Sequence, residues 1–166
     1  MTAQIIGRLL FMLGGAAGGF FAAGELRARH HFLAAMERAA AHMRGEIGDL
    51  GTPLPVLFER LSADETAGFF FRLVMEGETG MREAAWQIAA KSAREKYRLC
   101  DADMQALLIL GEGLGQYGLE DQLRRLAAAE RALAHRVAAA EENRQRYAKL
   151  LRFGGFAAGA VAALLI

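Results

Sequence analysis

Three glycines spell the motif G-x-G-x-x-G, which in many enzymes holds the pyrophosphate of a dinucleotide. They are Gly113, Gly115 and Gly118. The motif functions when it follows a β-strand and opens a helix, because the helix N-terminus then faces the phosphates. Here an apolar helical stretch precedes the glycines. The sequence therefore argues against a nucleotide site, and we expect no cofactor.

The other side chains that could do chemistry lack the spacing that chemistry requires. No two histidines have metal-ligand spacing on one helix face, and no carboxylate motif joins them. The histidines are His30, His31, His42 and His135. The single Cys100 excludes an internal disulfide and a cysteine-built metal site. Asp101 and Asp103 suit a helix cap and a first-turn charge better than an acid–base pair. We therefore predict no catalytic residue, no metal site, and a structural or interaction protein that is not an enzyme.

Composition predicts an all-helical protein. Of the 166 residues, 54% are hydrophobic and two are proline. This length is sufficient for one domain with a buried core. The formal net charge of +1 gives no indication of nucleic-acid binding.

Two long segments carry matching apolar seams with spacings of three and four residues. Residues 119–166 contain no proline, and no glycine before Gly154, so they predict one continuous helix. Its seam comprises Leu119, Leu123, Leu126, Leu133, Val137, Ala140, Tyr147 and Leu151. The helix over residues 25–50 has a similar seam: Leu26, Leu33, Met36, Ala40, Met43, Ile47 and Leu50. Two such helices are expected to pair as an antiparallel stalk.

Four shorter helices are predicted between these two. We expect Thr52 to cap the first of them, with Pro53 as its first residue, and Asp101 to cap the last. The fourth helix of the chain is expected to place four residues inward: Met81, Ala85, Ile88 and Ala89. Aromatic residues are expected to form the core: Phe69, Phe70, Phe71 and Trp86. The predicted architecture is an all-α bundle of about six helices, whose two long helices continue into N- and C-terminal transmembrane helices.

Both ends of the chain are apolar. Residues 5–24 and 147–166 each reach the roughly 20 residues needed to cross a bilayer, provided that flanking cations extend to the interface. We predict transmembrane helices over these residues and a helical domain over residues 25–146. Glycines four apart are expected to let the spans pack closely. They are Gly14, Gly15, Gly18, Gly19, Gly155 and Gly159.

The basic residues next to the two spans predict the orientation. They lie mostly on the side of the central domain. Arg27, Arg29 and Arg38 follow the first span, and four more precede the uncharged residues 153–166: Arg144, Arg146, Lys149 and Arg152. Cationic residues that flank membrane spans stay in the cytoplasm. We therefore expect a protein of the cell membrane whose central domain lies in the cytoplasm and whose two termini lie on the far side. A competing interpretation of the first span is a secretory signal peptide cleaved after Ala22-Ala23-Gly24, which would release a secreted helical domain.

The order and spacing of several short motifs resemble the stage III sporulation protein AB family of endospore-forming bacteria. The motifs are an N-terminal span, Glu46-Ile47, Thr52-Pro53-Leu54, Ala85-Trp86, Gly111-Glu112, Leu114-Gly115, Gln122, and Tyr147 through Arg152 to Gly155-Phe156. The chain departs from the family pattern at Gly118, where Asp is usual, and at Leu151, near which a Trp is common. These departures bear on local contacts at the two positions.

The resemblance implies a non-enzymatic part of a complex that joins the mother cell and the forespore across two membranes. The family's soluble domain is similar to the platform proteins of type II secretion and type IV pilus machines. The implied partners are other proteins of the sporulation complex, including its cytoplasmic ATPase, and membrane lipid. An oligomer of the chain itself is left open as a further partner. The implied location is the mother-cell membrane around the forespore. An enzyme that acts on lipid at the membrane face remains an alternative from a different functional class.

Two turns are the candidate partner-contact sites, because loops on a rigid scaffold carry contacts more often than helix faces do. Their residues are Thr52, Pro53, Leu54, Pro55, Gly111, Gly115, Asp121 and Gln122. The same residue types also start and stop helices, so a purely structural role competes with partner contact.

Overall fold

A computed structural model describes the backbone of residues 2–77 and 81–165, and the side chains of residues 23–77 and 81–147. Every regular element over these residues is a helix, and the predicted helical class and the number of six helices are confirmed. The helices are α1 (Thr2–Leu50), α2 (Leu54–Leu61), α3 (Gly68–Glu76), α4 (Arg82–Tyr97), α5 (Asp101–Gly111) and α6 (Leu119–Leu165).

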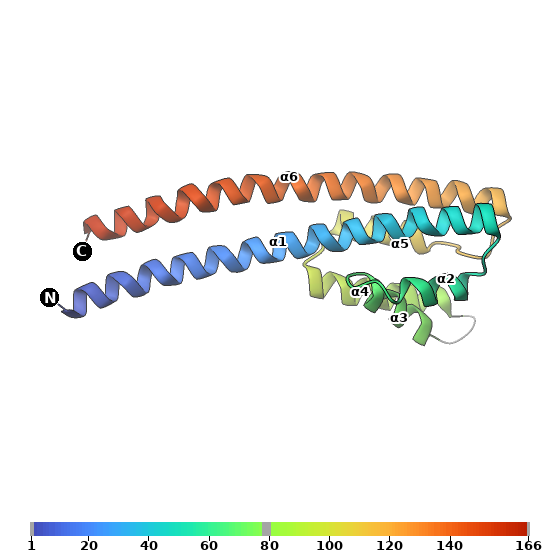
Figure 1. Cartoon of the computed structure of the whole chain (residues 1–166), viewed down its shortest axis with the longest axis horizontal. Helices are drawn as coiled ribbons and strands as arrows, with labels where there is room; N and C mark the ends of the chain where they lie inside the picture. Colours follow the sequence, from blue (N-terminus) through green and yellow to red (C-terminus); the bar gives the residue numbers. More distant parts are fainter. Residues whose placement is uncertain (1, 78–80, 166) are drawn as a thin grey trace.

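The two long helices, α1 and α6, run antiparallel and side by side, as predicted (Figure 1). Their register is set by contacts along the pair. His30 Nε2 lies 3.6 Å from a Glu141 oxygen, and Arg44 Nε donates to Glu130 Oε2 at 2.8 Å. Moving six residues from His30 toward the N-terminus, and six from Glu141 toward the C-terminus, brings Gly24 opposite Tyr147. The two predicted spans therefore begin at the same level of the helical pair.

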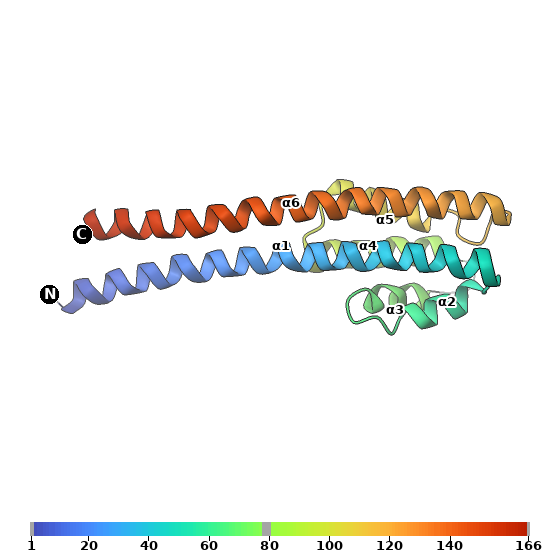
Figure 2. The same cartoon turned by 45° about the horizontal axis from the view of Figure 1, so that its top comes forward.

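Helices α2 to α5 pack against one half of this pair, away from the chain termini (Figures 1 and 2). The core between them is aromatic, as predicted. Phe70 and Phe71 are fully buried and Trp86 is 2% exposed, with the Phe70 and Trp86 rings in a T-shaped contact at 4.9 Å. The Trp86 indole donates to the Leu107 carbonyl at 2.8 Å, so its buried N–H is satisfied.

Gly111 lies directly against the Trp86 indole. A Cβ added at Gly111 would collide with the ring, so α5 can approach α4 this closely because the residue has no side chain. The Ala85-Trp86 and Gly111-Glu112 motifs therefore meet in the core through the contact between Trp86 and Gly111.

Two predicted helix starts are wrong. Thr52 does not cap α2, which begins after Pro53. The Thr52 hydroxyl donates to the Glu46 carboxylate at 2.7 Å instead. Asp101 is not the cap of α5 either, because Cys100 occupies that position and Asp101 is the first helical residue. The Asp101 carboxylate instead forms an ion pair with Arg94 at 2.7 Å.

The predicted inward faces of α1 and α4 are partly wrong. Ala85 and Ala89 are buried as expected, but Met81 and Ile88 are 57% and 59% exposed. Leu50, at the end of the α1 seam, is 72% exposed. Ile88 lies on a different face of α4 from the buried Ala85 and Ala89, while Met81 precedes α4 and Leu50 is the last residue of α1, so these apolar side chains stay on the surface.

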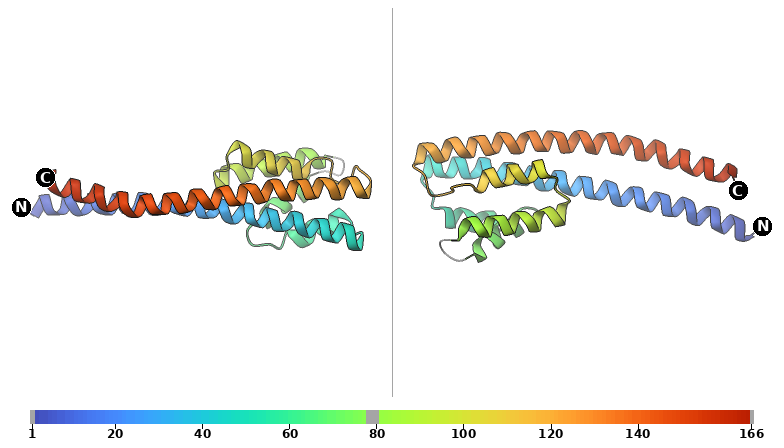
Figure 3. Two further views of the ribbon diagram at one scale, coloured as in Figure 1. Left: turned by 90° about the horizontal axis from the view of Figure 1, so that it is seen from above. Right: turned by 180° about the vertical axis from the view of Figure 1, so that it is seen from behind.

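Both predicted membrane spans lie largely outside the residues whose side chains are described. Over the residues that were searched, no helix is both long and apolar enough to cross a membrane. The packing glycines of the predicted spans also fall outside that region: Gly14, Gly15, Gly18, Gly19, Gly155 and Gly159. The backbones of α1 and α6 remain adjacent as far as the two chain ends (Figure 3).

Candidate functional site at the distal turns

The two turns predicted to contact a partner meet at the end of the bundle farthest from the chain termini (Figure 1). Gly115 lies so close to Leu54 that a Cβ at Gly115 would come within 2.9 Å of a Leu54 methyl carbon. The first turn links α1 to α2, and the second links α5 to α6. The fold therefore joins two segments that are about 60 residues apart in the sequence.

The first turn is held by the Glu46 carboxylate. One of its oxygens accepts hydrogen bonds from the Thr52 hydroxyl at 2.7 Å and from Arg60 Nη1 at 2.9 Å. The Thr52 hydrogen bond, with a further contribution from Arg60, places the pKa of Glu46 below its usual value. Gly51 has a φ of 63°, a left-handed conformation that glycine adopts without strain. Together these contacts fix the corner between α1 and α2.

The second turn is shaped by two glycines and one aromatic ring. Gly113 and Gly115 have φ values of 67° and 80°, which side chains rarely adopt. The Tyr117 ring packs against Gly113, and the Arg125 guanidinium lies 4.0 Å from the ring centroid. Tyr117 is nevertheless 40% exposed, so its outer face is available. The G-x-G-x-x-G sequence thus forms a turn between two helices, not a strand-to-helix phosphate loop.

The predicted contact residues divide into supporting and exposed positions. Leu54, Gly111 and Gln122 are buried, with Gln122 only 9% exposed, so they support the turns from below. Thr52 is half-buried. The exposed members are Pro53, Pro55, Gly115 and Asp121. Asp121 forms an ion pair with Arg124 one turn later on α6.

Four exposed apolar side chains surround these turns, and we call them the distal surface: Leu50, Val56, Tyr117 and Leu119. Leu50 and Leu119 are 72% and 54% exposed. None of the four is among the predicted contact residues, and Leu119 was assigned to a buried seam. The distal surface can make nonpolar contact with a partner, because apolar side chains exposed together often mark interaction sites.

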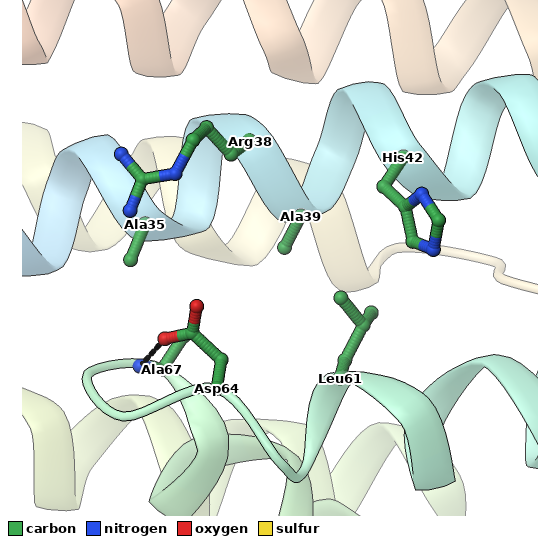
Figure 4. Close-up of a pocket in the computed structure, with 7 residues that line it drawn as sticks. All are labelled: Ala35, Arg38, Ala39, His42, Leu61, Asp64 and Ala67. Carbon is green, nitrogen blue, oxygen red and sulfur yellow. Dashed lines mark hydrogen bonds between the residues drawn. The ribbon is translucent and has the colours of Figure 1, made fainter.

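The cavities in the described part of the chain are small. One of about 140 Å³ lies between α1 and the loop after α2, with Arg38 and His42 on one side and Asp64 on the other (Figure 4). The Asp64 carboxylate is already used, because it accepts the Thr66 and Ala67 amides at 2.8 and 2.7 Å. A second cavity of about 270 Å³ lies between α3 and α4 and is mostly apolar. Small-molecule sites typically occupy about 300–1,000 Å³ with several converging polar groups.

A family comparison bears on the identity of the chain. The family model for stage III sporulation protein AB matches residues 4–166. The chain belongs to the stage III sporulation protein AB family. No curated protein and no solved structure matches it. Membership implies a role in sporulation and confirms the resemblance drawn from the short motifs.

This member of the stage III sporulation protein AB family also contains a buried ion-pair cluster that we did not predict. Asp103 on α5 is completely buried. It accepts hydrogen bonds from Arg29 Nε of α1 at 2.7 Å, Arg136 Nε of α6 at 2.9 Å and the Cys100 amide at 3.0 Å. The cluster ties three helices together at the end of the bundle nearest the chain termini.

The two arginines decide the charge state of Asp103. Burial by itself raises the pKa of Asp103, but the hydrogen bonds from Arg29, Arg136 and the Cys100 amide outweigh burial and leave the pKa below its usual value. The same contact raises the pKa of Arg136. One signal in the sequence could have revealed the site. Asp103 stands three residues before Ala106 and four before Leu107, on the buried face of α5.

Proposed function

We propose that this protein is a non-enzymatic, membrane-anchored component of the mother-cell-to-forespore complex needed for endospore formation. It acts as a platform that binds the complex's cytoplasmic ATPase or ring components. The apolar end segments anchor the protein in the mother-cell membrane, the domain over residues 25–146 lies in the cytoplasm, and both termini lie on the far side. Family membership supports the sporulation role.

The observation that carries the platform role is the meeting of the two turns at the distal surface. From Gly24 to Leu50, α1 rises 1.5 Å per residue, which places this surface about 40 Å beyond the apolar segment. The antiparallel α1–α6 pair and the Asp103 cluster make this a stiff connection. An apolar surface held at that height is suited to contact a large cytoplasmic partner without steric conflict with the membrane.

Anchoring is supported by the helical register. Because Gly24 and Tyr147 lie opposite each other, the apolar segments start at one level and extend in the same direction. Two helices that both insert into one bilayer from the same side must enter it at the same level. On the side of the bundle, Arg27 and Arg29 follow Gly24, and Arg144 and Arg146 precede Tyr147.

A non-catalytic role is supported by how the carboxylates near the interior are used. Asp103 is held by two arginines, and Asp64 caps a turn with two backbone amides. A general acid or base needs a carboxylate that can reach a substrate proton, and these two already serve as structural acceptors.

The test is binding of the purified ATPase of the complex to the full chain in lipid nanodiscs. The variant combines Val56→Asp and Leu119→Asp, which place a charge on the distal surface. Val56 is the third residue of α2 and Leu119 the first of α6, and acidic residues are tolerated in a first helical turn. We expect the Kd to rise at least about tenfold while helix content and thermal melting stay unchanged.

The matched control is Ile88→Asp, which places the same charge on an exposed apolar residue of α4 away from the turns. It should bind the ATPase normally. In the sporulating host, the double variant should fail to restore heat-resistant spores to a deletion strain, whereas Ile88→Asp should restore them. Unchanged binding by the double variant would remove the distal surface from the proposal.

A further inference from the structure

The end of the bundle opposite the distal surface is the turn between α4 and α5. Arg98 ends α4 in a left-handed conformation, with a φ of 52°, and its side chain is 72% exposed. Arg98 Nε lies 3.5 Å from a Glu25 oxygen on α1. Glu25 is the residue directly after the apolar segment that ends at Gly24. The Arg98 guanidinium is therefore at the level where this segment begins.

The position of this turn is fixed by the buried cluster next to it. Asp103, in the first turn of α5, is bound to Arg29 of α1 and Arg136 of α6 at 2.7 and 2.9 Å. Figures 1 and 3 show the α4–α5 turn as the part of α2–α5 nearest the chain ends. In a bilayer the polar layer on each side of the hydrocarbon is about 5–8 Å thick. A side chain level with Glu25 lies within that layer.

The two ends of the bundle differ in charge. The segments near the α4–α5 turn carry eight lysines and arginines and six carboxylates, which gives a net charge of +2 when the histidines are counted as neutral. These segments are residues 25–29, 94–103 and 136–147. The segments near the distal surface carry four lysines and arginines and seven carboxylates, which gives a net charge of −3. These segments are residues 46–60, 82–83 and 112–125. An anionic membrane attracts the end with the α4–α5 turn and repels the end with the distal surface. This favours the same orientation of the bundle as the proposed anchoring.

Two cations at the basic end are only weakly engaged within the protein. Arg98 contacts Glu25 at 3.5 Å, a longer distance than the 2.7 Å of the buried Arg29–Asp103 pair. The Lys96 ammonium lies 4.2 Å from the Phe69 ring centroid, and the residue is exposed. A guanidinium can form two parallel hydrogen bonds with a phosphate. Glu25, at 3.5 Å from Arg98 Nε, does not occupy these donors, so Arg98 can still bind a phosphate.

We propose that the α4–α5 turn binds the headgroups of anionic phospholipids through Arg98 and Lys96. This inference rests on the proposed anchoring, because the apolar segments place the turn at the membrane surface. Lipid contact at the turn adds a second attachment beside the two spans. It holds the bundle upright, so the distal surface points away from the membrane.

The test uses the full chain in bilayers that contain spin-labelled phosphatidylglycerol or spin-labelled phosphatidylcholine. Electron paramagnetic resonance gives the relative association of each lipid with the protein. Each Lys or Arg near the membrane surface raises the association constant for anionic lipid about fivefold. We expect Arg98→Gln to lower the preference for phosphatidylglycerol about fivefold. The matched control, Arg124→Gln, removes one exposed positive charge at the distal end and should leave the preference unchanged.

A second measurement does not depend on the substitution of Arg98. A nitroxide at Ala102→Cys, in a Cys100→Ser background, should lie in the headgroup layer by its accessibility to oxygen and to a water-soluble nickel complex. The same label at Ala128→Cys, on the exposed face of α6, should be in water.

The outcomes separate this inference from the proposed function. Extraction of the wild-type chain from membranes by alkaline carbonate would overturn both the anchoring and the lipid contact. A chain that stays in the membrane, but shows equal effects of Arg98→Gln and Arg124→Gln and a water-exposed label at position 102, would overturn the lipid contact alone.

Discussion

Replacing Asp103 by Asn should destabilise the protein strongly, although the change is small in size. Asn cannot balance the two positive charges that meet at this position. Asp103 is fully buried, and the side chains of Arg29 and Arg136 are only 12% and 26% exposed. Removing one partner of a buried ion pair typically costs about 3–5 kcal/mol. Because Arg136 retains some solvent contact, we expect about 3 kcal/mol.

The assay is urea unfolding of the full chain in detergent micelles, followed by far-ultraviolet circular dichroism. The matched control is Asp101→Asn, two residues away on the same helix. Asp101 is 83% exposed and pairs with Arg94 at 2.7 Å, so its loss should cost under about 1 kcal/mol. Since a domain is typically stable by only about 5–15 kcal/mol, the difference between the variants is measurable. Equal losses in the free energy of unfolding for the two substitutions would refute the argument that Asp103 balances the charges of Arg29 and Arg136 and so joins three helices.

The pH dependence gives an independent check on the same residue. The folded-state pKa of Asp103 lies below its ordinary value of 3.8. The contribution of Asp103 is therefore fully present above pH 3.8 and is lost as the pH falls through the lower folded-state pKa. The wild type should lose this part of its stability in acid, whereas Asp103→Asn should lack it. A variant with the same acid profile as the wild type would contradict the assignment.

Two further predictions concern a close packing contact and a surface carboxylate. Gly111→Ala should cost about 1–3 kcal/mol, because its Cβ would collide with the Trp86 indole, whereas Gly45→Ala meets no atom and should be neutral or stabilising by thermal melting. The pKa of Glu141 is lowered to about 2, first by hydrogen bonds from Arg144, so any stability it contributes is present above pH 4.5 and lost toward pH 2. Carboxyl carbon NMR should find this midpoint near 2, and Arg144→Gln should move it toward 4.5; a midpoint that stays fixed would contradict the pairing.

Much of the fold could be predicted because it depends on local periodicity. The seams of residues 25–50 and 119–147 specify two long helices, and matching seams favour their antiparallel pairing. Burial of large aromatic side chains is strongly favourable, so the burial of Phe70, Phe71 and Trp86 was predictable, whereas Phe69 is only partly buried. The two turns could be located from Gly51, Pro53 and the glycines after residue 112, since these residues interrupt helices.

The candidate site was predicted only in part. The sequence located both turns but could not show that they meet, because their contact depends on how α2 and α5 pack on the long helices. It also assigned Leu119 to a buried seam. The helical period gives the direction of a side chain, but whether another helix covers it depends on where the shorter helices end.

The sequence by itself determined the helical class, the two long helices, the aromatic core and the positions of the turns. Each follows from residue types within one or two helical turns. Only the tertiary structure decided that Asp103 is buried between Arg29 and Arg136, which lie 74 and 33 residues away. It likewise decided that Thr52 bonds to Glu46 and that Arg98 reaches Glu25. The contacts of Asp103 and Arg98 depend on the distances between helices, and the Thr52 contact depends on the corner between α1 and α2. The seams of individual helices specify neither.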